Sequence, residues 1–192
     1  MTWAMYMLCK HPSMQARLRQ EVRANLPPLD DDTPVTSEML DKCHYLQAVC
    51  NEVLRLYAPV PLTLREAARD TSILGQYVPK GTTILIAVWA INQSTALWSD
   101  AGEFKPDRWM GPGKANSGGA GSAYSFMTFL HGPRSCIGQQ FAKAEFASLL
   151  AAVAGRFEFE LEDKDVKIDI KTGITARPKD GLNVILRPVD GW

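Results

Sequence analysis

Four segments of the chain carry apolar residues at helical spacing, with one face suited to packing and charged residues elsewhere. Prolines mark the ends of several segments: Pro12 stands in the first turn of one, and Pro59 and Pro61 break the strongest. The first segment has no capping residue ahead of it, so we interpret it as the tail of a helix that begins upstream. The predicted helices span residues 1–10, 12–25, 37–57 and 138–155.

Between and after these segments the pattern changes to short β-branched or apolar runs separated by glycine and proline, which predicts strands. Residues 110–124 hold five glycines and few apolar side chains, and they predict a long irregular loop. The order of helices, sheet, loop, helix and sheet predicts a predominantly α chain with small β-sheets (α+β), forming one unit over residues 1–192. The expected strands are 64–70, 73–78, 82–89, 157–161, 168–170 and 182–186, with a polar loop at 27–35 and a turn at 178–181.

Composition narrows the class of protein without naming a chemistry. The chain has 192 residues, 46% of them apolar, and its 21 basic residues balance 21 acidic ones. A balanced charge argues against nucleic-acid binding, which needs a basic surplus. The longest apolar run, Ile84 to Ile91, is too short to cross a bilayer, so we expect no membrane segment in this chain. Four cysteines without a C-x-x-C pair do not predict a disulfide framework.

The segment Phe129–Gly138 (FLHGPRSCIG) carries the most chemical information. Cys136 follows a Gly-Pro turn and stands at the start of a predicted helix, where backbone N–H groups favour negative charge. Arg134 adds a positive charge nearby. Gly132 and Gly138 permit tight turns and close approach to a flat, bulky group. A thiolate in this place is suited either to binding iron or to attacking an electrophile.

The pattern F-x-x-G-x-R-x-C-x-G resembles the heme-binding loop of the cytochrome P450 family, and every specified letter is present. The resemblance implies the cofactor heme b (iron-protoporphyrin IX), with Cys136 as the axial ligand of its iron. It also implies that Arg134 pairs with a heme propionate, that Phe129 packs near the thiolate, and that Gly138 borders the cofactor. The whole loop is most similar to fungal microsomal members. A buried, inert cysteine in a glycine-rich turn is the alternative.

A second motif supports the first. Glu52 and Arg55 stand at i and i+3 on the strongest predicted helix, so their side chains share a face. Taken alone, this spacing is typical of a solvated surface pair. It resembles the family's E-x-x-R motif, and residues 104–109 (FKPDRW) resemble the family's P-x-R-F/W segment. The resemblance implies that Arg108 joins Glu52 and Arg55 in a buried structural triad. The triad would lock the helix to the segment Phe129–Gly138, called the ligand loop below.

The resemblance also places residues around the cofactor and substrate. It implies a second propionate contact at Arg65. It implies that Val60, Leu62, Thr63 and Ile174 line a substrate pocket. Ordinary core or turn packing is the alternative for these positions.

The resemblance covers essentially the whole chain, which is similar to the C-terminal portion of the family's fold; we expect the N-terminal part, with its oxygen-activating helix, to be absent. It implies a heme-thiolate monooxygenase that inserts one oxygen atom of O2 into a small organic substrate. The resemblance also implies that NADPH–cytochrome P450 reductase supplies the electrons and that the full-length protein resides at the cytosolic face of the endoplasmic reticulum membrane. The alternative is a truncated, non-catalytic remnant that cannot hold heme. A third reading is a thiol hydrolase that uses Cys136 and His131, although His131 is a free position in the family pattern.

Overall fold

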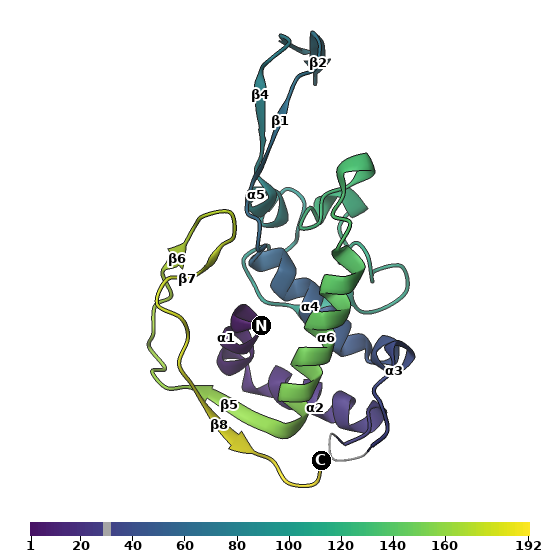
Figure 1. The fold of residues 1–192 in the computed structure, drawn as a ribbon, viewed down its shortest axis with the longest axis vertical. Helices are drawn as coiled ribbons and strands as arrows, with labels where there is room; N and C mark the ends of the chain where they lie inside the picture. Colours follow the sequence, from purple (N-terminus) through teal and green to yellow (C-terminus); the bar gives the residue numbers. More distant parts are fainter. Residues whose placement is uncertain (29–31) are drawn as a thin grey trace.

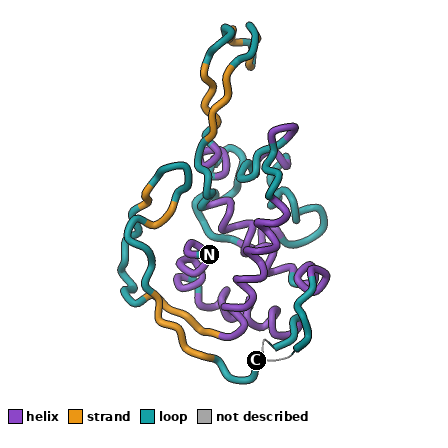
Figure 2. The backbone as a smooth tube through the Cα atoms, viewed as in Figure 1, coloured by secondary structure: helices purple, strands orange, loops and turns teal. Residues whose placement is uncertain are grey.

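The structure is a computed structural model that describes residues 1–28 and 32–192 (Figure 1). The described helices gather in one body, while the strands lie at its periphery (Figure 2). None of these helices is long and apolar enough to span a membrane. The predicted α+β class, weighted towards helix, is confirmed. The helices are α1 (Thr2–Lys10), α2 (Pro12–Asn25), α3 (Ser37–Lys42), α4 (His44–Leu56), α5 (Val88–Asn92) and α6 (Gln139–Arg156).

The strands form antiparallel pairs. The ribbon of β1 and β4 extends away from the helical body and carries β2 and β3 at its tip (Figure 1). The β5–β8 pair runs along the other end of the body. The pairs are β1 (Thr63–Glu66) with β4 (Thr83–Ile86), β2 (Thr71–Ile73) with β3 (Gln76–Val78), β5 (Phe157–Leu161) with β8 (Val184–Pro188), and β6 (Ile170–Lys171) with β7 (Arg177–Pro178).

The single helix predicted over residues 37–57 is wrong, because the chain breaks at Cys43 into α3 and α4. The Thr36 hydroxyl caps α3 by accepting from the Met39 amide. The start of α4 is capped from another helix: the carboxylate of Glu21 accepts 2.8 Å hydrogen bonds from the amides of Tyr45 and Leu46. These amides lack partners within their own helix, so the distant carboxylate makes the new start possible.

Several strand, turn and loop predictions need correction or restriction. The strand expected over residues 64–70 ends at Glu66. The strand expected over residues 73–78 is divided by a turn between β2 and β3, where Leu74 and Gly75 adopt left-handed backbone. The strand expected over residues 82–89 ends at Ile86, and α5 follows it; an apolar run alone does not separate strand from helix. The turn expected at residues 178–181 begins with the last residue of β7. The loop predicted at residues 27–35 includes 29–31, which lie outside the described residues. The irregular loop over residues 110–124 is confirmed as a succession of turns that ends in a short 3-10 helix.

Two apolar clusters hold the helical body together, and α4 contributes to both. The larger cluster joins α1, α2, α4 and α6. The smaller one joins the other side of α4 to the loops before α6 through Trp98, Trp109 and Phe126. Gly118 lies against this cluster with a positive φ of 58°, and a Cβ there would come within 2.7 Å of the Trp98 ring. Because α4 is enclosed from Tyr45 to Leu56, charged residues on it must find partners inside the protein.

Candidate functional site

A short, closed loop presents Cys136 ahead of α6. The Cys136 amide donates a 2.8 Å hydrogen bond to the Phe129 carbonyl, which closes the loop at its base. Leu130 and Gly132 adopt left-handed backbone with φ of 59° and 74°, which turns the chain tightly. Helix α6 begins at Gln139, three residues after Cys136, with Gly138 as its N-cap residue, and the thiol is exposed. The loop therefore holds a free sulfur close to the positive end of a helix.

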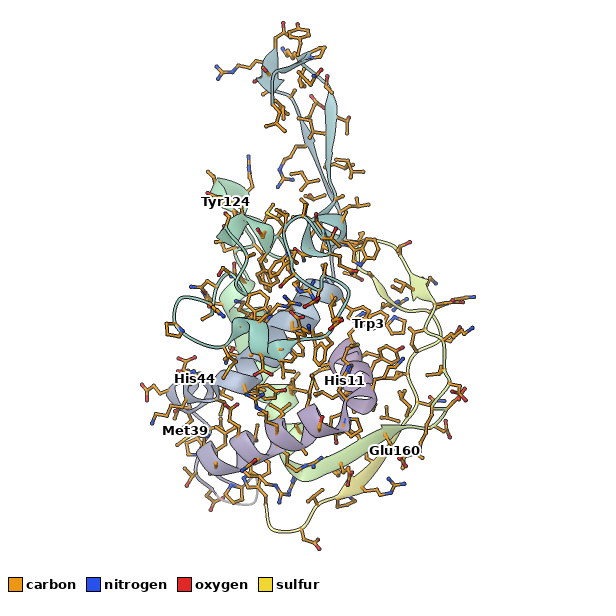
Figure 3. All side chains as sticks on the ribbon, turned by 180° about the vertical axis from the view of Figure 1, so that it is seen from behind. Trp3, His11, Met39, His44, Tyr124 and Glu160 are labelled. Carbon is orange, nitrogen blue, oxygen red and sulfur yellow. The ribbon has the colours of Figure 1, made fainter. Side chains whose placement is uncertain are left out.

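His131 stabilises the loop rather than pairing with the thiol. Its Nε2 lies 3.1 Å from the Phe126 carbonyl oxygen, and its ring packs against Tyr124 with centroids 4.8 Å apart. Tyr124 is labelled in Figure 3. No hydrogen bond joins His131 to Cys136 within the described residues. A Cys–His nucleophilic pair therefore finds no support in this geometry.

The surroundings of the sulfur fit a heme group. Arg134 is exposed, and its guanidinium forms no ion pair with the described residues, so it is available to a propionate. Ile137 and Phe141 beside the thiol are exposed apolar side chains, which suit contact with a macrocycle. Gly138 borders the thiol, because a Cβ built on it would lie 3.9 Å from the sulfur, in van der Waals contact. Within residues 1–28 and 32–192 no cluster of three His, Cys, Asp or Glu side chains could hold a bare metal ion.

Phe129, at the start of the ligand loop, and Lys143, on α6, lie close to each other. Phe129 is half-buried against the smaller apolar cluster, together with Phe126. The Lys143 ammonium lies 6.0 Å from the ring centroids of both phenylalanines, within reach of a cation–π interaction. Burial lowers the pKa of Lys143 from its ordinary value.

Glu52 is the centre of a buried network on α4. Its carboxylate is fully buried and accepts five hydrogen bonds. Arg55 supplies two, from Nε at 2.9 Å and Nη2 at 2.8 Å, and Arg108 supplies one from Nε at 3.0 Å. The Lys105 amide and the Trp109 indole complete the set at 3.0 and 2.8 Å. The structure thus brings together the three residues predicted as a triad.

The two arginines use their remaining donors on backbone carbonyls. Arg55 Nη1 donates to Asn92 at 2.8 Å and Ala101 at 2.7 Å. Arg108 donates to the carbonyls of Ser99 and Asp100. The network therefore connects α4 directly to residues 99–109. Its hydrogen bonds reach the segment before the ligand loop through Asn92, which bonds to Arg55, Met127 and Thr128.

The residue predicted to contact a propionate and the residues predicted to line a substrate pocket do not form one site. Arg65 on β1 donates to Thr63 Oγ1 and to the Leu64 carbonyl, so its bonds are within its own strand. A cavity of about 550 Å³ lies between the start of α1, the end of α4 and the β6–β7 hairpin, with Leu62 in its wall. Val60, Thr63 and Ile174 are not among the described residues that line it.

This cavity is mainly apolar. Trp3, labelled in Figure 3, stacks on Tyr57 with centroids 4.2 Å apart and planes at 9°. Both rings line the cavity, as does Trp89. The Ala176 amide donates to the Pro59 carbonyl at 2.7 Å. That bond joins the two chain segments in which the substrate residues were predicted.

Sequence reasoning missed three polar residues of this region. Trp109 completes the donors around Glu52, and its position directly after Arg108 was the available signal. Asn92 and Thr128 are buried and bonded to each other at 2.8 Å. No spacing in the sequence marks this last pair, because its members come from segments 36 residues apart.

Comparisons with known proteins agree with this geometry. The family model for cytochrome P450 matches residues 1–185. Cytochrome P450 monooxygenase sphH of Aspergillus fumigatus is 55% identical over 99% of this chain and 36% of that protein. Cytochrome P450 monooxygenase ALT8 of Alternaria alternata is 43% identical over 100% of this chain and 38% of that protein. The chain thus spans just over a third of the curated relatives it matches, and it belongs to the cytochrome P450 family.

Proposed function

We propose that this chain is the heme-ligand portion of a monooxygenase that inserts one oxygen atom of O2 into an organic substrate. The observation that carries the proposal is the exposed Cys136 sulfur at the head of α6, in a loop closed by the bond from its amide to Phe129. Heme, when bound, supplies the chemistry that activates dioxygen. The chain's own residues bind and orient that group.

Each residue has a defined task in this proposal. Cys136 provides the thiolate ligand, and the nearby helix start favours its negative charge. Arg134 provides a forked, permanently charged partner for a propionate. Ile137 and Phe141 cover apolar surface of the cofactor. The buried network around Glu52 keeps α4 and residues 99–109 in fixed positions, so that the loop is held on a rigid base.

The substrate proposed for this enzyme is a small, mostly apolar organic molecule. The cavity beside Trp3, Leu62 and Trp89 supports this, because burial of apolar surface dominates binding in such a site. A Leu62→Ala variant of the heme-loaded protein should bind such molecules more weakly, as reported by the substrate-induced change in the heme spectrum. Equal affinity in both proteins would remove Leu62 from the substrate site.

The spectrum of the reduced, CO-bound protein tests the proposal. Expressed with heme available, the chain should show the long-wavelength Soret band of a thiolate-ligated heme. Cys136→Ser should lose that band while keeping its helical circular dichroism, because a hydroxyl cannot replace the thiolate. The alternative is a non-catalytic remnant that holds no heme. A folded wild-type chain without the band would establish the remnant.

We further propose NADPH–cytochrome P450 reductase as the electron donor and the endoplasmic reticulum membrane as the site of action. Family membership supports both. Lys143 on α6 is the proposed contact for an acidic partner, since its ammonium lies behind the ligand loop beside Phe129. Lys143→Glu should slow reduction of the heme-loaded protein by the reductase. An unchanged rate would exclude Lys143 from the contact.

A further inference from the structure

Asn92 is the last residue of α5, and both the oxygen and the nitrogen of its side-chain amide form a hydrogen bond. The side chain is fully buried. Its Oδ1 accepts a 2.8 Å hydrogen bond from the Met127 amide, and its Nδ2 donates to Thr128 Oγ1 at 2.8 Å. Its backbone carbonyl accepts from Arg55 Nη1 at 2.8 Å. Because both ends of the amide are engaged, the side chain has one orientation that satisfies its partners.

Thr128 extends the same chain of bonds to α4. Its hydroxyl accepts from Asn92 and donates to the Leu54 carbonyl at 2.8 Å. Leu54 belongs to the last turn of α4, where carbonyls have no partner within the helix. Thr128 therefore caps α4 from a mostly buried position, with 9% of the residue exposed. The next residue, Phe129, supplies the carbonyl that closes the loop onto the Cys136 amide.

We propose that Asn92 and Thr128 are positioning residues that fix where the ligand loop begins relative to α4. The buried pair Glu52–Arg55 acts on Cys136 through them rather than directly. The sequence of contacts runs from Arg55 to the Asn92 backbone, from the Asn92 side chain to Met127 and Thr128, and from there into the loop.

The energetics favour this role over simple packing. Removing the Thr128 hydroxyl leaves both the Asn92 Nδ2 and the Leu54 carbonyl without their bond in a buried place. A buried polar group without a hydrogen bond costs more free energy than the loss of one methyl contact. The segment around Thr128 should therefore open to water more readily. The positioning itself needs no cofactor, and only its consequence for the heme rests on the proposed function.

Hydrogen exchange of the full, heme-free chain tests the positioning. Thr128→Val keeps the shape of the side chain and removes its hydroxyl, whereas Thr128→Ser keeps the hydroxyl. We expect amides of residues 127–136 to exchange about tenfold faster in Thr128→Val and in Asn92→Ala. Thr128→Ser and the control Thr71→Val, on an exposed strand, should exchange at the wild-type rate. In the double variant Asn92→Ala/Thr128→Val, the acceleration of amide exchange should be much smaller than the product of the two single accelerations, because the two residues share a bond.

Unchanged loop exchange in Thr128→Val, or an equal rise in α2, overturns the proposal. The wild-type chain provides a test that needs no variant to fold. Its Met127 amide should exchange as slowly as core amides of α4, because it is bonded inside the protein. Exchange as fast as that of the exposed Tyr124 would overturn the proposal.

A spectroscopic readout separates this inference from the proposed function. In the heme-loaded protein, Thr128→Val should shift CO-bound heme from the thiolate Soret band towards the shorter-wavelength band of a displaced ligand, and Thr128→Ser should restore it. An unshifted spectrum in a Thr128→Val protein with faster loop exchange overturns the link between the pair and the sulfur. A wild-type chain that binds no heme contradicts the proposed function alone, since the exchange result stands without heme.

Discussion

The indole Nε1 of Trp109 donates a 2.8 Å hydrogen bond to Oε2 of Glu52, the same oxygen that accepts from Arg55 Nε. The other carboxylate oxygen accepts three bonds, so a fully buried negative charge is surrounded by donors. Burial of a charge is tolerated only under such conditions. The short 3-10 helix that carries Trp109 and Arg108 is thereby fastened to α4.

Glu52→Ala should therefore destabilise the chain severely. The substitution leaves two arginines and an indole without their acceptor inside the protein, and we expect the free energy of unfolding to fall by about 3–5 kcal/mol. Heme retention should be lost with it. Urea denaturation followed by circular dichroism measures the first effect, and heme content after gel filtration measures the second. Glu162→Ala, at an exposed site, is the control; full heme content in Glu52→Ala would refute the assigned role.

Trp109→Phe isolates one bond of the network. Phenylalanine keeps an aromatic ring in the cluster where Trp109 lies 5.8 Å from Trp98 and 5.0 Å from Phe126, measured between centroids. Only the indole N–H and part of the ring are removed, so we expect a loss of about 1–3 kcal/mol in the free energy of unfolding. In a Glu52→Ala chain, Trp109→Phe should cause little further loss in the free energy of unfolding, because the bond is then already absent. Full additivity would show that the indole acts by packing alone.

The sequence predicts those parts of the site that belong to local motifs. Glu52 and Arg55 share a helix face by their spacing, and Arg108 follows from the segment around it. The closing bond of the ligand loop agrees with a turn at Gly132. In contrast, the start of α4 depends on Glu21, more than twenty residues upstream. Such contacts arise from packing between distant segments, which neither periodicity nor a short motif contains.

Asn92 shows the same limit more sharply. It directly follows the apolar run Ile84 to Ile91, in which half of the residues are β-branched, and this composition led to the predicted strand over residues 82–89. The chain instead turns into α5 after Ile86, where the Trp89 amide bonds to the Pro61 carbonyl and Arg55 holds the Asn92 carbonyl. Tertiary partners therefore decide the conformation, and the role proposed for Asn92 can be inferred only from those partners.

The buried thiol of Cys50 should make stability depend on pH in the alkaline range. Burial raises the pKa of Cys50 from its ordinary value of 9.0 to about 12. Below about pH 9 the thiol is protonated in both states, and its contribution is fully present. As pH rises towards 12, the unfolded chain releases the proton first, so the free energy of unfolding falls.

Denaturation of wild-type and Cys50→Ala chains at several pH values checks this effect. The variant should lose less stability between about pH 9 and about pH 11 than the wild type, whatever its stability at neutral pH. Cys9 and Cys43, whose pKa values burial also raises to about 11, remain in both chains and cancel in the comparison. Cys136→Ala, at the exposed thiol, serves as the control. Parallel curves for wild type and Cys50→Ala would show that Cys50 is not buried in this way.

The effect of Gly155→Ala on the free energy of unfolding should change sign when Trp192 is removed. Gly155 lies in the last turn of α6, and a Cβ built on it would overlap the Trp192 ring. Gly155→Ala should displace the indole and break its bond to the Leu26 carbonyl, lowering the free energy of unfolding by about 1–3 kcal/mol. In a Trp192→Ala chain the space is free, and the same substitution should stabilise by about 0.5–1 kcal/mol, because alanine favours a helix over glycine. Urea denaturation of the four chains gives both values, and a loss of equal size in both backgrounds would mean that Trp192 does not pack on Gly155 in solution.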